Sequence, residues 1–224
     1  MDMRRQISSY KFEILNDQVV ISLGEWLFPV NCVQLSPMNQ TSNQVKNLET
    51  ITLGGGCFWC LDAVYARVRG VLSVDSGYTN GHVKKPTYQD VCSGDTGHNE
   101  VVQLMYDPTD ISLNEILEIF FLVHDATTLN AQGNDVGTQY RSGIYFSSAE
   151  QEKTAKTFIA ELKTDKVFSR PIVTEVLPLD NYSKAEEYHQ DFFAKNPNQG
   201  YCVAVAGPKV AKLRKTFADR VKET

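Results

Sequence analysis

The stretch GGGCFWC, from Gly54 to Cys60, places two thiols three positions apart behind a run of three glycines. Cys57 falls where an expected strand meets an expected helix, and the first turn of a helix carries unpaired N–H groups and the positive end of the dipole. A thiolate is stabilised there, so we expect Cys57 to have a lowered pKa and to act as a nucleophile. Cys60 lies one helical turn on, close enough for a disulfide with Cys57. The competing interpretation is that both cysteines are small core residues of an apolar helix.

Glu100 is the candidate proton donor. It opens the stretch EVVQLMYD, and the alternation of a strand puts it on one face with Val102, Leu104 and Tyr106. If that face is buried, desolvation raises the pKa of the Glu100 carboxyl and lets it act as a general acid near neutral pH. The alternative is a solvated carboxylate on the outer face, and the pattern favours neither.

Aromatic and polar side chains surround these candidates in the sequence. Phe58 and Trp59 are about 100° apart around a helix axis, so we expect one to enter the core and the other to face a cleft beside the thiol. Tyr88, Asp135 and Tyr140 stand in stretches rich in Gly, Asn and Asp. Taken singly, such residues are common in turns and at surfaces.

The other thiols and imidazoles are interpreted as structural or superficial. Cys32 and Cys92 are expected to be inert. Of the histidines, only His98 stands near a candidate, two residues before Glu100, and it is kept as a supporting group. The full set is His82, His98, His124 and His189.

The elements that must position these residues follow from hydrophobic periodicity. Their order, β-α-β-β-α-β, is the split βαβ pattern of ferredoxin-like, two-layer α+β sandwiches. Ser112 and Glu115 form a capping box at the start of the second helix. A long helix, a strand and two further helical stretches follow as C-terminal additions. The expected ranges are strand 49–56, helix 57–68, strand 70–79, strand 100–107, helix 112–125, strand 141–146, helix 148–165 and strand 171–179.

Two long loops, 77–95 and 130–140, interrupt this core, and loops of that length in a compact domain are usually functional. Residues 1–47 differ in character. Their apolar runs lack a steady period, and 36–47 is polar, as a linker is. We expect residues 1–47 to be a poorly ordered extension and linker, and 48–224 to be the working domain. Met38 lies in the linker and is an alternative start.

Bulk properties narrow the class of protein. The 224 residues carry a formal net charge of -5 and are 42% hydrophobic, which suits one domain with an extension. No basic cluster with interleaved aromatics indicates nucleic-acid binding. No stretch is long and apolar enough to span a membrane, and the N-terminus lacks the apolar segment of a signal peptide. Five unevenly spread cysteines fit a reducing compartment, so we expect a cytoplasmic protein.

Several blocks together resemble the A-type peptide methionine sulfoxide reductases. The blocks are GGGCFW, GYTNG, PTYQDVCSGDTGHNE, GNDVGTQYRSGIYF and EYHQDFFAKNPNQGYC, and the resemblance runs from about residue 48 to the end. It implies that Cys57 attacks the sulfoxide sulfur and that Glu100 protonates the oxygen. It further implies polar contacts to that oxygen and an apolar wall around the S-methyl group. The polar contacts would come from Tyr88, Asp135 and Tyr140, and the wall from Phe58 and Trp59.

The resemblance also implies the catalytic cycle and its partners. Methionine S-sulfoxide, free or in proteins, would be reduced to methionine while Cys57 becomes a sulfenic acid. A second thiol then closes an intramolecular disulfide, which thioredoxin reduces by exchange. No metal and no cofactor is implied, and we expect a monomer. Cys60 stands where the family often has Gly, and Cys202 stands at the usual resolving position, so the resolving thiol remains open between the two.

Two rival functions can be stated from the residues. A thioredoxin-like dithiol exchanger would use the Cys57-x-x-Cys60 pair. It would have no use for Glu100 or for the tyrosines. A zinc module would need two further ligands beside this pair, and the remaining Cys and His residues form no second tight pair.

Overall fold

The computed structural model describes residues 11–15, 18–23 and 26–29 as strands, and residues 47–223 in full. The chain divides into two compact units, Met1–Val45 and Lys46–Thr224. The first unit contains an antiparallel sheet in the order β1-β2-β3, made of β1 (Lys11–Leu15), β2 (Gln18–Leu23) and β3 (Trp26–Pro29). Cys32, Met38 and most of the predicted linker lie outside the described residues.

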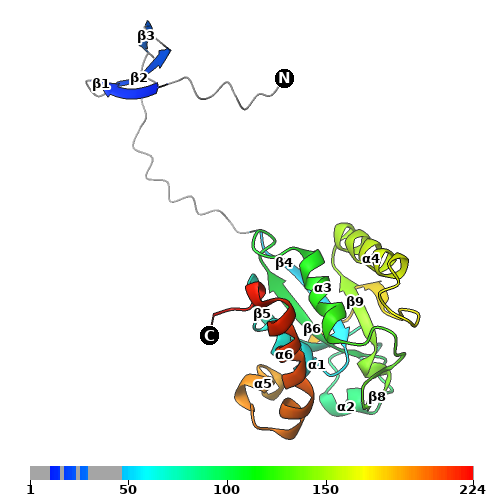
Figure 1. Cartoon of the computed structure of the whole chain (residues 1–224). Coiled ribbons are helices and arrows are strands. Elements are labelled where there is room, and N and C mark those ends of the chain that lie inside the picture. The colour runs from blue at the N-terminus through cyan, green and yellow to red at the C-terminus, as the bar shows by residue number, and fades with distance from the viewer. Residues whose placement is uncertain (1–10, 16–17, 24–25, 30–46, 224) are drawn as a thin grey trace. The chain divides into compact units, whose positions relative to one another are not determined.

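The second unit is built on a mixed six-stranded sheet with the order β10-β9-β4-β6-β5-β11 (Figure 1). Neighbouring strands are antiparallel except β9 and β10, which are parallel. The strands are β4 (Glu49–Gly55), β5 (Val71–Thr79), β6 (Asn99–Tyr106), β9 (Ser142–Phe146), β10 (Glu175–Pro178) and β11 (Ser183–Lys184).

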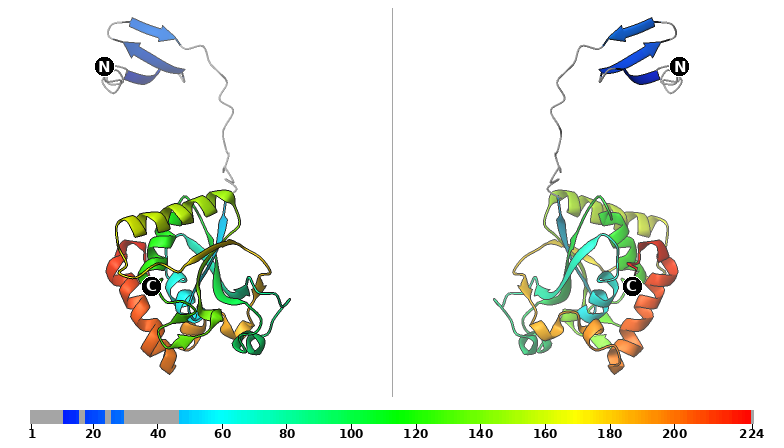
Figure 2. Two further views of the ribbon diagram at one scale, coloured as in Figure 1. Left: turned by 90° about the vertical axis from the view of Figure 1, so that its right-hand side faces the viewer. Right: turned by 90° about the vertical axis from the view of Figure 1, so that its left-hand side faces the viewer.

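Helices pack on this sheet and on one another. The helix α1 lies against β5 and β6, and it also contacts α5 and α6, while α3 contacts α4 and α6. Figure 2 shows α5 and α6, orange to red, gathered on one side of the sheet. The helices are α1 (Phe58–Tyr65), α2 (Tyr88–Cys92), α3 (Leu113–Val123), α4 (Ala149–Thr164), α5 (Phe192–Lys195) and α6 (Gly207–Thr216). A π-helical turn, η4 (Cys202–Ala206), leads directly into α6.

Local sequence accounts for where the helices begin. Ser112 and Glu115 form the predicted capping box of α3, in which each side chain accepts from the other residue's backbone N–H. Thr87 and Asp90 form a second capping box that starts α2. Each box satisfies donors that the first helical turn leaves unpaired, so both helix starts are fixed by local contacts.

The long loops contain short elements that periodicity did not predict. The loop 77–95 holds α2, and the loop 130–140 holds the hairpin β7 (Ala131–Gln132) with β8 (Asp135–Val136) and the turn η2 (Thr138–Tyr140). The strand predicted at 171–179 is shorter, because β10 pairs with β9 only over Glu175–Pro178.

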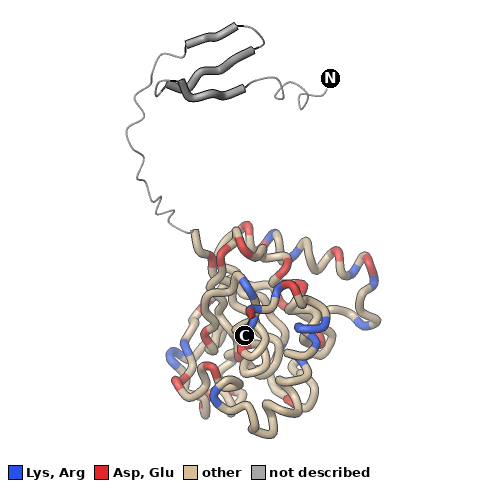
Figure 3. Tube along the Cα trace, turned by 60° about the vertical axis from the view of Figure 1, so that its left-hand side comes forward, with Lys and Arg blue, Asp and Glu red and all other residues tan. Residues whose placement is uncertain are grey.

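Acidic and basic residues are interspersed along the domain (Figure 3). Among the described residues, no helix combines the length and apolar character needed to cross a bilayer.

Candidate functional site

Cys57 occupies the junction between β4 and α1. Its backbone is the N-cap of α1, and its side chain is nearly buried. The preceding Gly56 has φ +88°, and a Cβ there would lie 2.5 Å from Cγ of Gln132. A Cβ on Gly54 would lie 2.2 Å from Nδ2 of Asn99. The glycines are therefore needed because neighbouring protein segments approach the backbone beside Cys57.

Glu100 lies next to this junction, on β6. Its side chain is 1% exposed. The residues on the same face of the strand, Val102, Leu104 and Tyr106, are also buried. The sequence left two alternatives for this face, and the structure has the buried one. The carboxylate Oε2 accepts the backbone N–H of Phe58 at 3.2 Å, which brings the carboxyl to the first turn of α1.

Burial raises the pKa of Glu100 from 4.5 to about 8; the Phe58 N–H opposes the shift and the charge of Asp135 adds to it. The carboxyl is thus mostly protonated at neutral pH. A neutral carboxylic acid beside a thiol is a proton donor in the correct state for general acid catalysis.

The structure corrects the prediction for Cys57. Burial raises the pKa of the Cys57 thiol well above its ordinary value, and the charges of Glu100 and Cys60 raise it further. Hydrogen bonds from Tyr201 and the Trp59 backbone act in the opposite direction without reversing the result. The helix N-terminus cannot outweigh desolvation here, since its first N–H is already directed at Glu100. Cys57 is therefore expected to rest as a thiol rather than a thiolate.

Tyr201 connects the second thiol to Asp135. The thiol of Cys60 donates to the Tyr201 hydroxyl, with 3.6 Å between sulfur and oxygen, and that hydroxyl donates to Oδ2 of Asp135 at 2.7 Å. Burial raises the pKa of Cys60, and the charge of Lys209 lowers it in part. Tyr201 was not among the residues predicted for the site, although it directly precedes Cys202 in the block EYHQDFFAKNPNQGYC.

The two predicted loop tyrosines also face this region. Tyr88 is the first residue of α2 and Tyr140 the last of η2, and both are half-buried. Burial is the main cause that raises the pKa of each, and the charge of Glu100 contributes to both. The charge of Cys57 contributes to the pKa of Tyr140. Both hydroxyls therefore remain protonated hydrogen-bond donors at the site.

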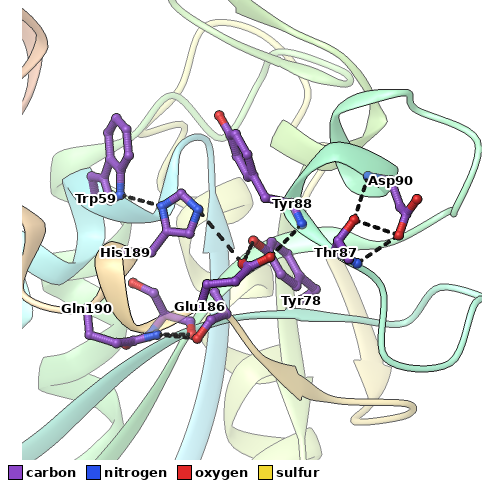
Figure 4. A network of polar contacts seen from close by, with 10 residues as sticks. Trp59, Tyr78, Thr87, Tyr88, Asp90, Glu186, His189 and Gln190 are labelled. Carbon is purple, nitrogen blue, oxygen red and sulfur yellow. Dashed lines mark hydrogen bonds and ion pairs between the residues drawn. The ribbon is translucent and has the colours of Figure 1, made fainter.

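Phe58 and Trp59 divide as predicted: Phe58 is buried in the core and Trp59 is partly exposed. The indole of Trp59 stacks on Phe192 with ring centres 3.7 Å apart and an interplanar angle of 6°. Its Nε1–H donates to Nδ1 of His189 at 3.1 Å (Figure 4). His189, interpreted from the sequence as structural or superficial, is in fact buried against the candidate site.

Cys202 lies in η4 and is fully buried, although no hydrogen bond to its sulfur is described. Burial raises its pKa, and the charge of Cys60 adds to the shift. The described cysteines Cys57, Cys60, Cys92 and Cys202 are all free thiols. Within residues 47–223, no group of three or more His, Cys, Asp or Glu side chains could hold a metal ion.

His98 does not support Glu100 in the way expected. It is buried, and its Nε2 lies 2.7 Å from the carbonyl oxygen of Val83. A Cβ on Gly81 would lie 2.2 Å from Cδ2 of the His98 ring, so the ring packs tightly under the loop that follows β5. Its contacts are those of a residue that fixes this loop.

The chain is similar in sequence and in fold to known proteins. Residues 49–221 match the family described as peptide methionine sulfoxide reductase. Peptide methionine sulfoxide reductase MsrA of Trichodesmium erythraeum is 55% identical over 174 residues, which is 78% of this chain and 98% of that protein. MsrA of Saccharolobus solfataricus is 54% identical over 175 residues, with the same two coverages. Reduced Mxr1 from Saccharomyces cerevisiae superposes with a TM-score of 0.65 at 37% identity, over 71% of this chain and 91% of that one. The chain therefore belongs to the peptide methionine sulfoxide reductase family.

Proposed function

We propose that the protein reduces the S epimer of methionine sulfoxide, free or within proteins, with Cys57 as nucleophile and Glu100 as general acid. The observation that supports this proposal is the position of the buried Glu100 carboxyl. It accepts the backbone N–H of Phe58, the residue that follows Cys57 at the start of α1. Its pKa of about 8 keeps a proton available at neutral pH. A sulfoxide becomes a good electrophile only when its oxygen is protonated or strongly hydrogen-bonded.

The first chemical step joins the Cys57 sulfur to the sulfoxide oxygen and releases methionine. Glu100 gives its proton to the oxygen as the Cys57 sulfur attacks the substrate sulfur and forms an S–S bond. The hydroxyl group then moves to the Cys57 sulfur while that S–S bond breaks. The proton of the thiol replaces the one that Glu100 has given. In sum, a thiol and a sulfoxide become a sulfenic acid and a thioether. Tyr88 and Tyr140 would hold the oxygen with their protonated hydroxyls, and Asp135 would act with them directly or through water.

A second thiol then resolves the sulfenic acid and releases water. Cys60 is the stronger candidate, because its N–H already binds the Cys57 carbonyl at 3.1 Å in the first turn of α1. Disulfides tolerate Cα separations of about 4.4–6.8 Å, and residues three apart in a helical turn fall in that range. Cys202 is buried in η4 and would have to leave it first. A relay, in which Cys202 exchanges with a Cys57–Cys60 disulfide, is the other arrangement.

Thioredoxin is proposed as the reductant that regenerates the thiols, since a dithiol is required to reopen the disulfide. We also propose a monomer in the cytoplasm, where free thiols such as the four described cysteines persist. For the fold, we propose a ferredoxin-like core. The support is the sheet segment β9-β4-β6-β5 with α1 and α3 as the connecting helices, to which β10 and β11 are added at the edges.

The dithiol exchanger is the second candidate function, favoured by the spacing of Cys57 and Cys60. A disulfide exchanger needs an exposed thiolate of lowered pKa. Both thiols here have raised pKa values, with burial as the main cause. That difference argues against exchange as the primary activity.

The test is reduction of the two resolved epimers of a methionine sulfoxide peptide, with a chemical dithiol as reductant. We expect the S epimer to be turned over much faster than the R epimer, and one equivalent of methionine or less to be released in the absence of dithiol. Cys57→Ser should release no methionine even in a single turnover, whereas Cys60→Ser should remain active with the chemical dithiol. Equal turnover of both epimers, or methionine release by Cys57→Ser, would contradict the proposal.

A further inference from the structure

The orientation of Trp59 is determined by residues after β11. Phe192 stacks on one face of the indole, and His189 accepts its N–H. The edge of the indole meets Tyr201, with ring centres 5.9 Å apart and an interplanar angle of 75°. Figure 4 shows the indole N–H and the His189 ring directed toward each other. Trp59 is thus held by a specific hydrogen bond in addition to packing.

The Trp59 bond fixes the state of His189. The indole N–H is only a donor, so Nδ1 of His189 must be the acceptor, and the imidazole is neutral with its proton on Nε2. Nε2 faces Oε2 of Glu186 at 3.9 Å, so the negative charge of Glu186 lies on the side of the ring that carries the proton. This favours the tautomer that can accept from Trp59.

Glu186 holds a second part of the site at the same time. Its Oε1 accepts the backbone N–H of Tyr88 at 2.9 Å, at the first residue of α2. Its Oε2 accepts the hydroxyl of Tyr78 at 2.9 Å. One carboxylate therefore connects the start of α2 with the ring that binds Trp59 (Figure 4).

The segment from Ala185 to Gln190, which contains Glu186 and His189, is hydrogen-bonded to the sheet. The Gln190 side chain accepts the N–H of Ser76 at 2.9 Å and donates to the Ser76 carbonyl at 3.0 Å. It also donates to the carbonyl of Ala185. The N–H of Ala185 in turn donates to the Ser76 carbonyl. Glu186 and His189 lie between these anchors, so their positions are set by β5 rather than by a free loop.

We propose that Glu186 and His189 are positioning residues that fix the indole of Trp59 relative to Tyr88 and thereby set the selectivity between sulfoxide epimers. An enzyme distinguishes mirror-related sulfoxides only if it places three groups around the sulfur. Here these are the nucleophile, the methyl group against Trp59, and the oxygen against Tyr88. The inference rests on the proposed function, and neither Glu186 nor His189 touches the substrate.

The test compares His189→Leu, which removes the acceptor, with His189→Asn, whose Oδ1 replaces Nδ1. We expect kcat/KM for the S epimer to fall about tenfold in His189→Leu, the fold-change for one lost hydrogen bond. Turnover of the R epimer should not fall, so the epimer ratio falls by the same factor. His189→Asn should restore most of the ratio. Glu186→Gln should shift it in the same direction by less, and His82→Leu, at an exposed loop position, serves as the matched control.

Two readouts separate positioning from general damage. The protein has two tryptophans, so a Trp26→Phe background makes Trp59 the sole fluorophore. In that background, time-resolved anisotropy should gain a fast component in His189→Leu and lose it in His189→Asn. Alkylation of Cys57 should proceed at the rate of the unsubstituted protein.

An unchanged epimer ratio in a folded His189→Leu protein would overturn the proposal. If that protein does not fold, an unchanged ratio in Glu186→Gln would overturn it. Loss of epimer preference in the unsubstituted protein would instead refute the proposed function.

Discussion

At the scale of single residues, the site combines two groups that burial keeps neutral. Glu100 and Cys57 both have raised pKa values, and burial is the main cause in each case. A substrate oxygen that enters between them meets a proton donor and a thiol, with no charge to displace. If these two groups have the proposed roles, the reaction depends on proton transfer within the bound complex.

Glu100→Gln tests this at the residue that holds the proton. General acid catalysis typically contributes about 10²–10⁴-fold, so single-turnover reduction of the S epimer should slow by a factor in that range. The rate of the unsubstituted protein should fall as pH rises through about 8, where Glu100 loses its proton. Stopped-flow measurement from pH 6 to 9.5 checks both. A near-normal rate in Glu100→Gln would contradict the role.

The contribution of Glu100 to stability should also fall as pH rises. The folded pKa of Glu100 is raised from 4.5 to about 8, so the folded state binds the proton more tightly than the unfolded chain. Its favourable contribution is complete below pH 4.5 and is lost as pH rises to about 8. Glu100→Gln stays neutral, so its melting temperature relative to the unsubstituted protein should rise across that window. A constant difference between pH 5 and 8.5 would contradict the assigned pKa.

Glu100 and Cys57 could be chosen as candidates from the sequence because their signals are local. Alternation along β6 grouped Glu100 with Val102, Leu104 and Tyr106 without showing which face is buried, and the strand-to-helix junction made Cys57 the candidate nucleophile. The sequence could not predict the pKa of Cys57, because the burial that raises it comes from segments distant in the chain, including the one that carries Tyr201. His189 was missed for the same reason, since its bond to Trp59 spans 130 positions.

At the scale of elements, the turn η4 determines how the second half of the cycle can run. Tyr201 precedes it and contacts Cys60 and Asp135, so the residue beside Cys202 is tied to the second thiol of α1. π-Helical turns often occur at functional sites. The Cys60 thiol, already in the first turn of α1, needs little movement to reach Cys57.

The resolving thiol can be identified by peptide mapping after one turnover without reductant. We expect a Cys57–Cys60 disulfide in the unsubstituted protein, and the same disulfide in Cys202→Ser, because closure within one turn needs little chain movement. Thioredoxin-coupled turnover of Cys202→Ser then shows whether a relay is needed. A Cys57–Cys202 disulfide in Cys60→Ser, together with an unchanged coupled rate, would assign resolution to Cys202.

The elements themselves were predictable where they were long or capped. Strands β4, β5, β6 and β9 and helices α1, α3 and α4 lie within a few residues of their expected ranges. The short elements α2, β7, β8 and β11 have too few residues to show a hydrophobic period, even though a local capping box fixes the start of α2. These short elements nevertheless carry or anchor Tyr88, Asp135 and the residues around His189.

At the scale of the whole molecule, the family match begins at residue 49 and leaves the N-terminal unit outside it. The chain divides between Val45 and Lys46, so the extension and the reductase domain are separate compact units. A protein that starts at Met38 should therefore keep the melting temperature and kcat/KM of the full chain. Differential scanning fluorimetry and the epimer assay check this. Loss of activity or solubility on truncation would mean that the extension stabilises the reductase domain.

The sheet edges have a consequence for association with other chains. β11 pairs over only two residues, and beyond it the Gln190 side chain occupies the main-chain groups of Ser76. The opposite edge strand, β10, ends at Pro178, which has no N–H to offer. Exposed edge strands template aggregation, and short edges with proline or covered backbone resist it. A peptide substrate brings its own extended backbone to the enzyme, and these blunted edges disfavour the addition of that backbone to the sheet as a further strand.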